Sequence, residues 1–124
     1  MGYRVMLAED AADIRDLMRF HLMMDGRFDL VGESGDGDDL VALVQREQPE
    51  VLISDMSLPG MNGLGLIETL RRECPACKIL VFSGFAMASR EMVSEAGADA
   101  VMEKTVHSFE EVVERAAALC AASA

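Results

Sequence analysis

The sequence predicts an α/β protein built on a parallel sheet that helices cover on both faces. Short apolar runs alternate five times with amphipathic stretches along the 124 residues. This alternation is typical of consecutive strand–helix units, whose strands lie parallel and are buried on both sides. In addition, each of several apolar runs ends at a polar side chain. A chain of this length usually forms one domain, and we expect residues 1–124 to do so.

The first half of the chain contains three expected strands and two helices. In chain order they are a strand at 4–8, a helix at 12–25, a strand at 28–32, a helix around 40–44 and a strand at 51–54. The first helix is indicated by apolar side chains that recur at helical spacing, and Asp25-Gly26 ends it. Residues 28–32 alternate like a half-buried strand. Pro49 marks the end of the second helix.

The second half continues the alternation. In chain order we expect a loop at 58–63, a helix from 64 to about 73, a strand at 78–83, a helix at 87–96, a strand at 100–102 and a helix at 108–121. Gly97 stands where helices favour a left-handed cap. Ser108 is the expected N-cap of the last helix, and Glu111 three residues later completes a capping box.

The charge and composition exclude several classes of function. The chain has 22 acidic against 11 basic residues and a net charge of -11, which argues against direct binding to nucleic acid or to an anionic membrane. Hydrophobic residues make up 51% of the chain, enough to build a core. The sequence contains neither a signal peptide pattern nor an apolar stretch long enough to span a bilayer. We therefore expect a cytoplasmic protein.

Two other features have structural interpretations. Cys74 and Cys77 spell C-x-x-C, but the pair follows a helix and precedes a strand, whereas a redox pair opens a helix. It also lacks the second pair that a zinc site needs. His21 lies on the apolar stripe of the first helix, where a packed imidazole is expected.

The candidate site consists of polar side chains that follow the strands. Glu9 and Asp10 follow the first strand, Asp55 the third, Ser83 ends the fourth and Lys104 follows the fifth. In an open parallel sheet, ligands bind beyond the carboxyl ends of the strands. Three converging carboxylates repel one another unless they stay hydrated and apart or a cation lies among them.

The chemistry of these groups suggests magnesium and phosphate. Oxygen-only ligands suit Mg2+ better than Zn2+. A carboxylate beside Mg2+ can act as a nucleophile toward a phosphoryl group and form an aspartyl phosphate. Lys104 and the Ser83 hydroxyl would then bind phosphoryl oxygens.

These residues, in this order, resemble the receiver domain of bacterial two-component response regulators over the whole chain. The family has an acidic pair after its first strand, matched by Glu9 and Asp10. Its phosphoacceptor begins a D-x-x-M/L-P-G-M-D/N-G stretch, which runs here from Asp55 to Gly63. Its Ser or Thr and its Lys match Ser83 and Lys104. The G-A-D before the fifth strand matches residues 97–99.

The resemblance implies a fold, a reaction and partners. The fold is a flavodoxin-like three-layer (βα)5 sandwich with strand order 2-1-3-4-5, an order known for such folds. Asp55 accepts a phosphoryl group from a sensor histidine kinase or a histidine phosphotransfer protein. Asp10, Asp55 and the backbone carbonyl of Ser57 hold Mg2+, and Glu9 assists through water. The face formed by the fourth helix, fifth strand and fifth helix, about 87–119, controls a downstream output domain or protein and can form a homodimer.

Two positions depart from the family pattern. The aromatic ring that reports phosphorylation is replaced by Val101, and the proline after the lysine is Thr105, so a cis bond is not expected there. The switch residues are therefore Ser83, Val101 and, as a substitute reporter, Phe85. These departures leave open a degenerate receiver that binds partners without phosphorylation.

A turnover enzyme is the third class of function. Phosphatases that use an aspartate nucleophile need D-x-D, and here the second acidic position is Ser57. We therefore expect a signalling domain that catalyses at most its own phosphorylation and dephosphorylation.

Overall fold

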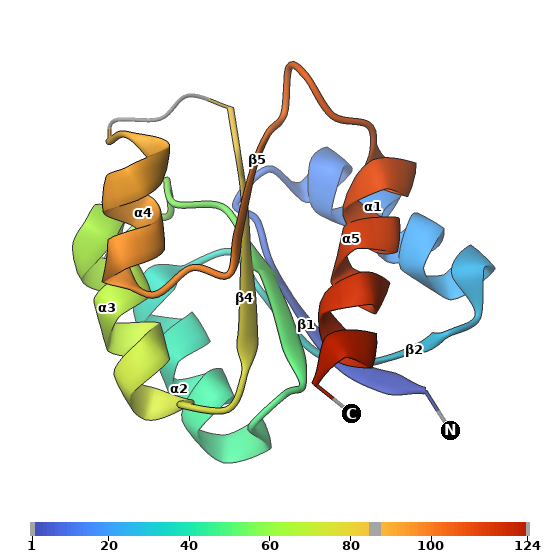
Figure 1. The fold of residues 1–124 in the computed structure, drawn as a ribbon, viewed down its shortest axis with the longest axis horizontal. Helices are drawn as coiled ribbons and strands as arrows, with labels where there is room; N and C mark the ends of the chain where they lie inside the picture. The colour runs from blue at the N-terminus through green and yellow to red at the C-terminus, as the bar shows by residue number, and fades with distance from the viewer. Residues whose placement is uncertain (1, 85–87, 124) are drawn as a thin grey trace.

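Ten elements alternate along the chain in this computed structural model, which describes residues 2–84 and 88–123 (Figure 1). The strands are β1 (Tyr3–Ala8), β2 (Phe28–Ser34), β3 (Val51–Ser54), β4 (Lys78–Ser83) and β5 (Ala100–Glu103). The helices are α1 (Ala12–Asp25), α2 (Gly37–Glu47), α3 (Gly63–Glu73), α4 (Arg90–Ala96) and α5 (Phe109–Ala122). All strand pairs are parallel, and the strand order is β2-β1-β3-β4-β5, as predicted.

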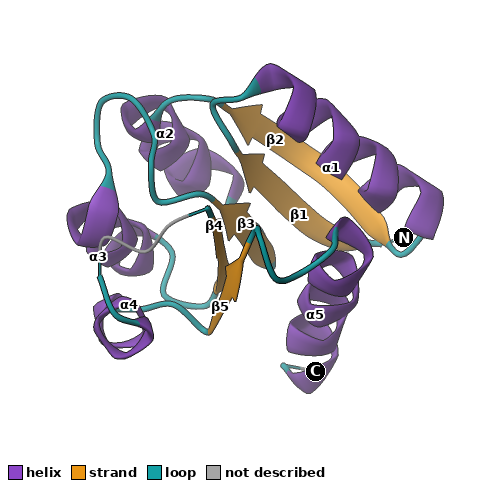
Figure 2. Ribbon diagram, turned by 90° about the horizontal axis from the view of Figure 1, so that it is seen from above, coloured by secondary structure: helices purple, strands orange, loops and turns teal. Residues whose placement is uncertain are grey.

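The helices form two outer layers on the sheet. Figure 2 shows α2, α3 and α4 on one face and α1 and α5 on the other. Each face has its own apolar core. Met6, Leu52 and Ile79 point toward the first group of helices, whereas Val5 and Ile53 point toward the second. Because successive strand residues face opposite sides, fully apolar strands such as β3 supply both cores.

The helix ends follow the local sequence with one difference. Gly26 ends α1 in the left-handed conformation, and the Ser108–Glu111 capping box is complete at the start of α5. Gly97 ends α4 with φ 134° and ψ 3°, so its φ is positive but its conformation is not the left-handed helical one expected. A Cβ there would lie 2.7 Å from Cβ of Arg71, so close packing also favours glycine.

Some boundaries differ from the predicted ones because tertiary pairing extends the strands. β2 continues to Ser34, where Glu33 and Ser34 pair with the last two residues of β1. β5 includes Glu103, which pairs with Ser83. The helix expected at 87–96 begins at Arg90, because Ser89 is its N-cap and its side chain accepts a hydrogen bond from the Met92 N–H. Residue 87 lies outside the described residues.

The C-x-x-C cysteines are structural. Cys74 and Cys77 are free thiols that are 2% and 1% exposed, within the core beneath α3. Burial and the neighbouring Cys74 raise the pKa of the Cys77 thiol, which keeps it protonated. His21 stacks on Phe109 at 5.4 Å between ring centroids, in agreement with a packed imidazole.

Candidate functional site

Asp55 follows β3 and places a buried carboxylate at the carboxyl edge of the sheet. It is 6% exposed, and its N–H donates to the Ala8 carbonyl at 3.0 Å, which continues the β1–β3 pairing. Oδ1 accepts hydrogen bonds from the Ser57 N–H at 3.0 Å and from the Ser83 hydroxyl at 3.1 Å. Oδ2 accepts from Lys104 Nζ at 2.7 Å. Both oxygens are thus oriented by fixed donors.

Glu9 and Asp10 lie beside Asp55, in the loop between β1 and α1. Glu9 is 4% exposed, whereas Asp10 is exposed. Glu9 Oε1 forms an ion pair with Lys104, and Oε2 accepts from the Ala11 N–H at 3.2 Å. Burial raises the pKa of Glu9, although the hydrogen bonds from Lys104 and Ala11 oppose this change. Arg15 of α1 fixes the loop by donating to the Glu9 carbonyl at 2.6 Å.

Lys104 places a positive charge between the two buried carboxylates. Burial alone would lower the pKa of Lys104, but its contacts with Asp55 and Glu9 outweigh burial and raise it. The ammonium is therefore held in its charged form. The sequence left open whether the acids stay apart or gather around a cation, and in this structure the cation between Glu9 and Asp55 is the lysine itself.

The three acidic side chains also lie close enough together to share one metal ion. One carboxylate oxygen from each of Glu9, Asp10 and Asp55 lies within 4.8 Å of the others. In the described part of the chain, no other group of three His, Cys, Asp or Glu side chains meets this criterion. An all-oxygen donor set with one exposed member fits a hard, partly hydrated cation such as Mg2+.

The remaining candidate residues differ in how close they lie to this cluster. The Ser57 N–H contacts Asp55, and the Ser57 side chain is exposed. Val101 is half-buried in β5, two strand positions before Glu103. The Lys104–Thr105 peptide bond is trans, as expected. Phe85, the proposed substitute reporter, lies outside the described residues.

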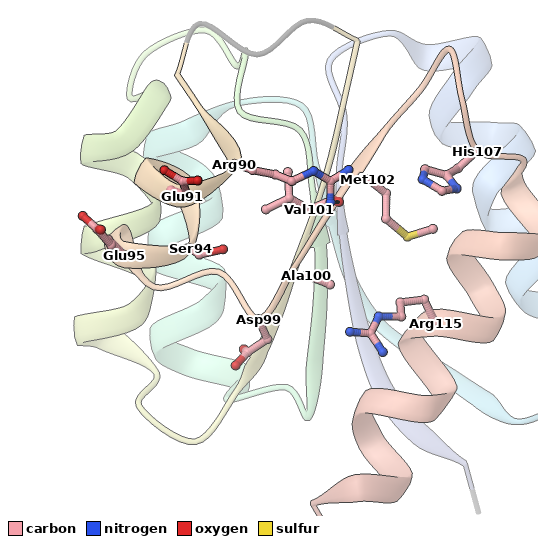
Figure 3. Close-up of a pocket in the computed structure, with 10 residues that line it drawn as sticks. All are labelled: Arg90, Glu91, Ser94, Glu95, Asp99, Ala100, Val101, Met102, His107 and Arg115. Carbon is pink, nitrogen blue, oxygen red and sulfur yellow. Dashed lines mark hydrogen bonds between the residues drawn. The ribbon is translucent and has the colours of Figure 1, made fainter.

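The face formed by α4, β5 and α5 contains a groove of about 680 Å³ (Figure 3). The Arg90 side chain extends from the start of α4 over β5, and Nη1 donates to the Val101 carbonyl at 2.9 Å. No pattern in the sequence predicted this contact. An arginine one residue after a serine N-cap was the available signal, but it gave no indication of the partner.

Fold and site together define an α/β protein with an acidic cluster, a hydroxyl and a lysine at the carboxyl edge of its sheet. The model of the response regulator receiver domain family matches residues 5–117, and the chain belongs to this family. Receiver domains are signalling domains of two-component systems. None of the helices in the described ranges has both the length and the apolarity needed to cross a membrane.

The relatives include proteins of similar length and longer proteins. Chemotaxis protein CheY of Thermotoga maritima is 32% identical over 96 residues, which cover 77% of this chain and 78% of that protein. A protein-glutamate methylesterase/protein-glutamine glutaminase of Myxococcus xanthus is 34% identical over 67% of this chain but only 23% of its own length. This chain therefore spans about a quarter of that longer relative.

Solved structures show the same fold. A LuxR-family DNA-binding response regulator from Staphylococcus aureus superposes with a TM-score of 0.86 at 26% identity, covering 95% of this chain and 98% of that one. A LuxR-family response regulator from Aurantimonas gives a TM-score of 0.88 at 25% identity, covering 98% and 87%. The expected fold class is confirmed.

Proposed function

We propose that residues 1–124 form one phosphoacceptor domain in which Asp55 receives a phosphoryl group from a phosphohistidine. The observation that carries this proposal is the set of donors around Asp55. Ser83 and Lys104 contact different oxygens of its carboxylate. The same two side chains lie where they would contact the oxygens of a phosphoryl group attached there.

The reaction is a displacement at phosphorus. An oxygen of Asp55 forms a bond to phosphorus, the P–N bond to the donor imidazole breaks, and its electron pair stays on that nitrogen, which takes up a proton. Lys104 then moves from the carboxylate to a phosphoryl oxygen, and the Ser83 hydroxyl donates to another. Acyl-phosphate chemistry of this kind needs neutralisation of charge more than it needs a general base.

The acidic cluster supports a requirement for Mg2+. Asp10, Asp55 and the Ser57 carbonyl would hold the ion, and Glu9 would assist through water. When bound, Mg2+ supplies positive charge that balances the phosphoryl oxygens. Exposed Asp10 keeps one side of the cluster open to solvent, as a cation that retains waters requires.

The partners follow from the same assignment. A cytoplasmic sensor histidine kinase or histidine phosphotransfer protein supplies the phosphoryl group, and the α4–β5–α5 face acts on an output domain or protein, or on a second copy. Phosphorylation adds a charge of about -1.5 to -2 at the site. Direct binding of nucleic acid by this domain is disfavoured by its net charge of -11.

Intact-mass spectrometry tests the phosphoacceptor function. The native chain, incubated with acetyl phosphate and Mg2+, should gain the mass of one phosphoryl group, and EDTA should prevent the gain. Asp55→Asn should abolish it, whereas Asp13→Asn, which changes an exposed carboxylate in the first turn of α1, should retain it. No gain in the native chain would instead support the degenerate receiver, which Val101 and Thr105 suggest.

A further inference from the structure

Arg15 of α1 reaches from the helix to the loop that carries Glu9 and Asp10. Its Nη1 atom donates to the Glu9 carbonyl at 2.6 Å, a short hydrogen bond of the kind that a charged donor forms. The Arg15 side chain is 25% exposed and lies beside Glu33 of β2, with 3.8 Å between Nε and Oε1. One guanidinium therefore connects the first helix, the second strand and the acidic loop.

The backbone around Glu9 is fixed on both sides. The Glu9 N–H donates to the Ser34 carbonyl at 3.0 Å, and the Glu9 carbonyl accepts from Arg15. Gly35 leaves the room that this arrangement needs, because a Cβ there would lie 3.0 Å from Arg15 Nη1 and 3.6 Å from the Asp10 Cα. Arg15 is thus packed into a defined place against the loop.

The contact with the Glu9 carbonyl also determines where Asp10 lies. The peptide unit between Glu9 and Asp10 is planar, so the direction of the carbonyl sets the position of the Asp10 nitrogen and Cα. Asp10 is exposed, and no hydrogen bond from the described residues holds its carboxylate. One of its oxygens nevertheless lies within 4.8 Å of carboxylate oxygens of Glu9 and Asp55. Its approach to the cluster therefore depends on the backbone that Arg15 holds.

We propose that Arg15 is a positioning residue for the magnesium site, through its hydrogen bond to the Glu9–Asp10 peptide. This inference rests on the proposed function. A positive charge near a cation site repels the cation, so removal of the charge alone would strengthen Mg2+ binding. Loss of the fixed peptide would weaken it. We expect the second effect to dominate, because Glu33 already balances the Arg15 charge and loss of a group that orients metal ligands weakens affinity by about 10- to 100-fold.

Mg2+ titration of the isotope-labelled chain, without phosphodonor, measures the affinity from the amide shifts of Asp10 and Asp55. Arg15→Met retains the apolar stem and should raise the dissociation constant for Mg2+ about tenfold. Arg19→Met is the matched control, since it removes the same charge from the same helix and also a contact with Glu33 at 2.8 Å. Arg19 donates to Asp16 and Glu33 but not to the Glu9 carbonyl, so this variant should bind Mg2+ like the native chain.

A second readout needs no metal. In the metal-free chain, the order parameter of the Asp10 backbone N–H should fall below about 0.6 in Arg15→Met and stay near about 0.85 in the native chain and in Arg19→Met. A role of Arg15 in stability alone would lower the free energy of unfolding without this local change. Circular dichroism verifies that each variant is folded.

The results distinguish the positioning role from the magnesium site itself. Equal or tighter Mg2+ binding in folded Arg15→Met than in Arg19→Met would overturn the positioning role and leave the magnesium site in place. A native chain whose resonances do not shift at millimolar Mg2+ would overturn the magnesium site, and the positioning role with it.

Discussion

Replacing Lys104 with methionine removes the cation that separates two buried carboxylates. The Glu9 and Asp55 side chains are 5% and 6% exposed, and that of Lys104 is 18% exposed. At 2.7 Å, the Lys104–Asp55 pair alone corresponds to a Coulomb energy of about 6 kcal/mol at an effective dielectric constant of about 20. Loss of hydration on burial offsets part of this energy. Methionine retains the apolar stem, so the change tests the charge.

The expected loss of stability lies at the lower end of the range for breaking a buried ion pair. We expect the free energy of unfolding to fall by about 3 kcal/mol. For a domain of this size, this corresponds to a decrease in Tm of about 12 °C. Urea unfolding followed by circular dichroism, at near-neutral pH and with EDTA present, measures it directly.

Lys78→Met is the matched control. Lys78 is a half-buried residue at the start of β4, at the amino ends of the strands and so far from the site. It forms no ion pair with the described residues. The two variants have the same net charge, so a general electrostatic effect cancels between them. If the free energies of unfolding of Lys104→Met and Lys78→Met differ by less than about 1 kcal/mol, the ion pairs of Lys104 do not stabilise the fold.

Three further results are expected. Arg71→Met should lower the free energy of unfolding by about 2 kcal/mol in urea, because the guanidinium donates to the Gly97 and Cys77 carbonyls, whereas Arg72→Met should change it by less than about 0.5 kcal/mol. Ser108→Ala should cost about 1 kcal/mol in thermal unfolding through loss of the capping box, and an unchanged Tm would contradict that role. The pKa of Lys104 is raised above its ordinary 10.5, so the stabilisation by its charge is complete below pH 10.5 and is lost as the pH rises through the raised pKa. The free energy of unfolding, measured at increasing alkaline pH, should therefore fall more steeply for the native chain than for Lys104→Met.

The sequence predicted the fold well because its apolar runs, its helical spacing and its helix caps all indicated the same elements. Apolar strands, helical spacing and caps such as Ser108 are local signals, and the structure contains all ten expected elements. Boundaries that depend on partners were less predictable. β2 extends to Ser34 only because Ser34 pairs with Ala8, and no local signal indicates this.

In the site, too, the positions of the residues were predictable from the sequence, whereas contacts that depend on packing were not. Polar residues directly after strands were expected to meet at one edge, and Ser83 and Lys104 do contact Asp55. The ion pair of Lys104 with Glu9 depends on how far each side chain reaches across the sheet, which spacing along the chain does not determine. The Arg90–Val101 contact depends likewise on how α4 lies against β5.

The position of the phosphoryl group is the most direct test of the proposed phosphoacceptor function. After incubation with acetyl phosphate and Mg2+, an aspartyl phosphate can be reduced with borohydride to homoserine, and tandem mass spectrometry then locates the converted residue. The proposed chemistry predicts conversion at residue 55 alone, and none when EDTA replaces Mg2+. Conversion at another carboxylate, or none in the native chain, would contradict the assignment of Asp55 as phosphoacceptor.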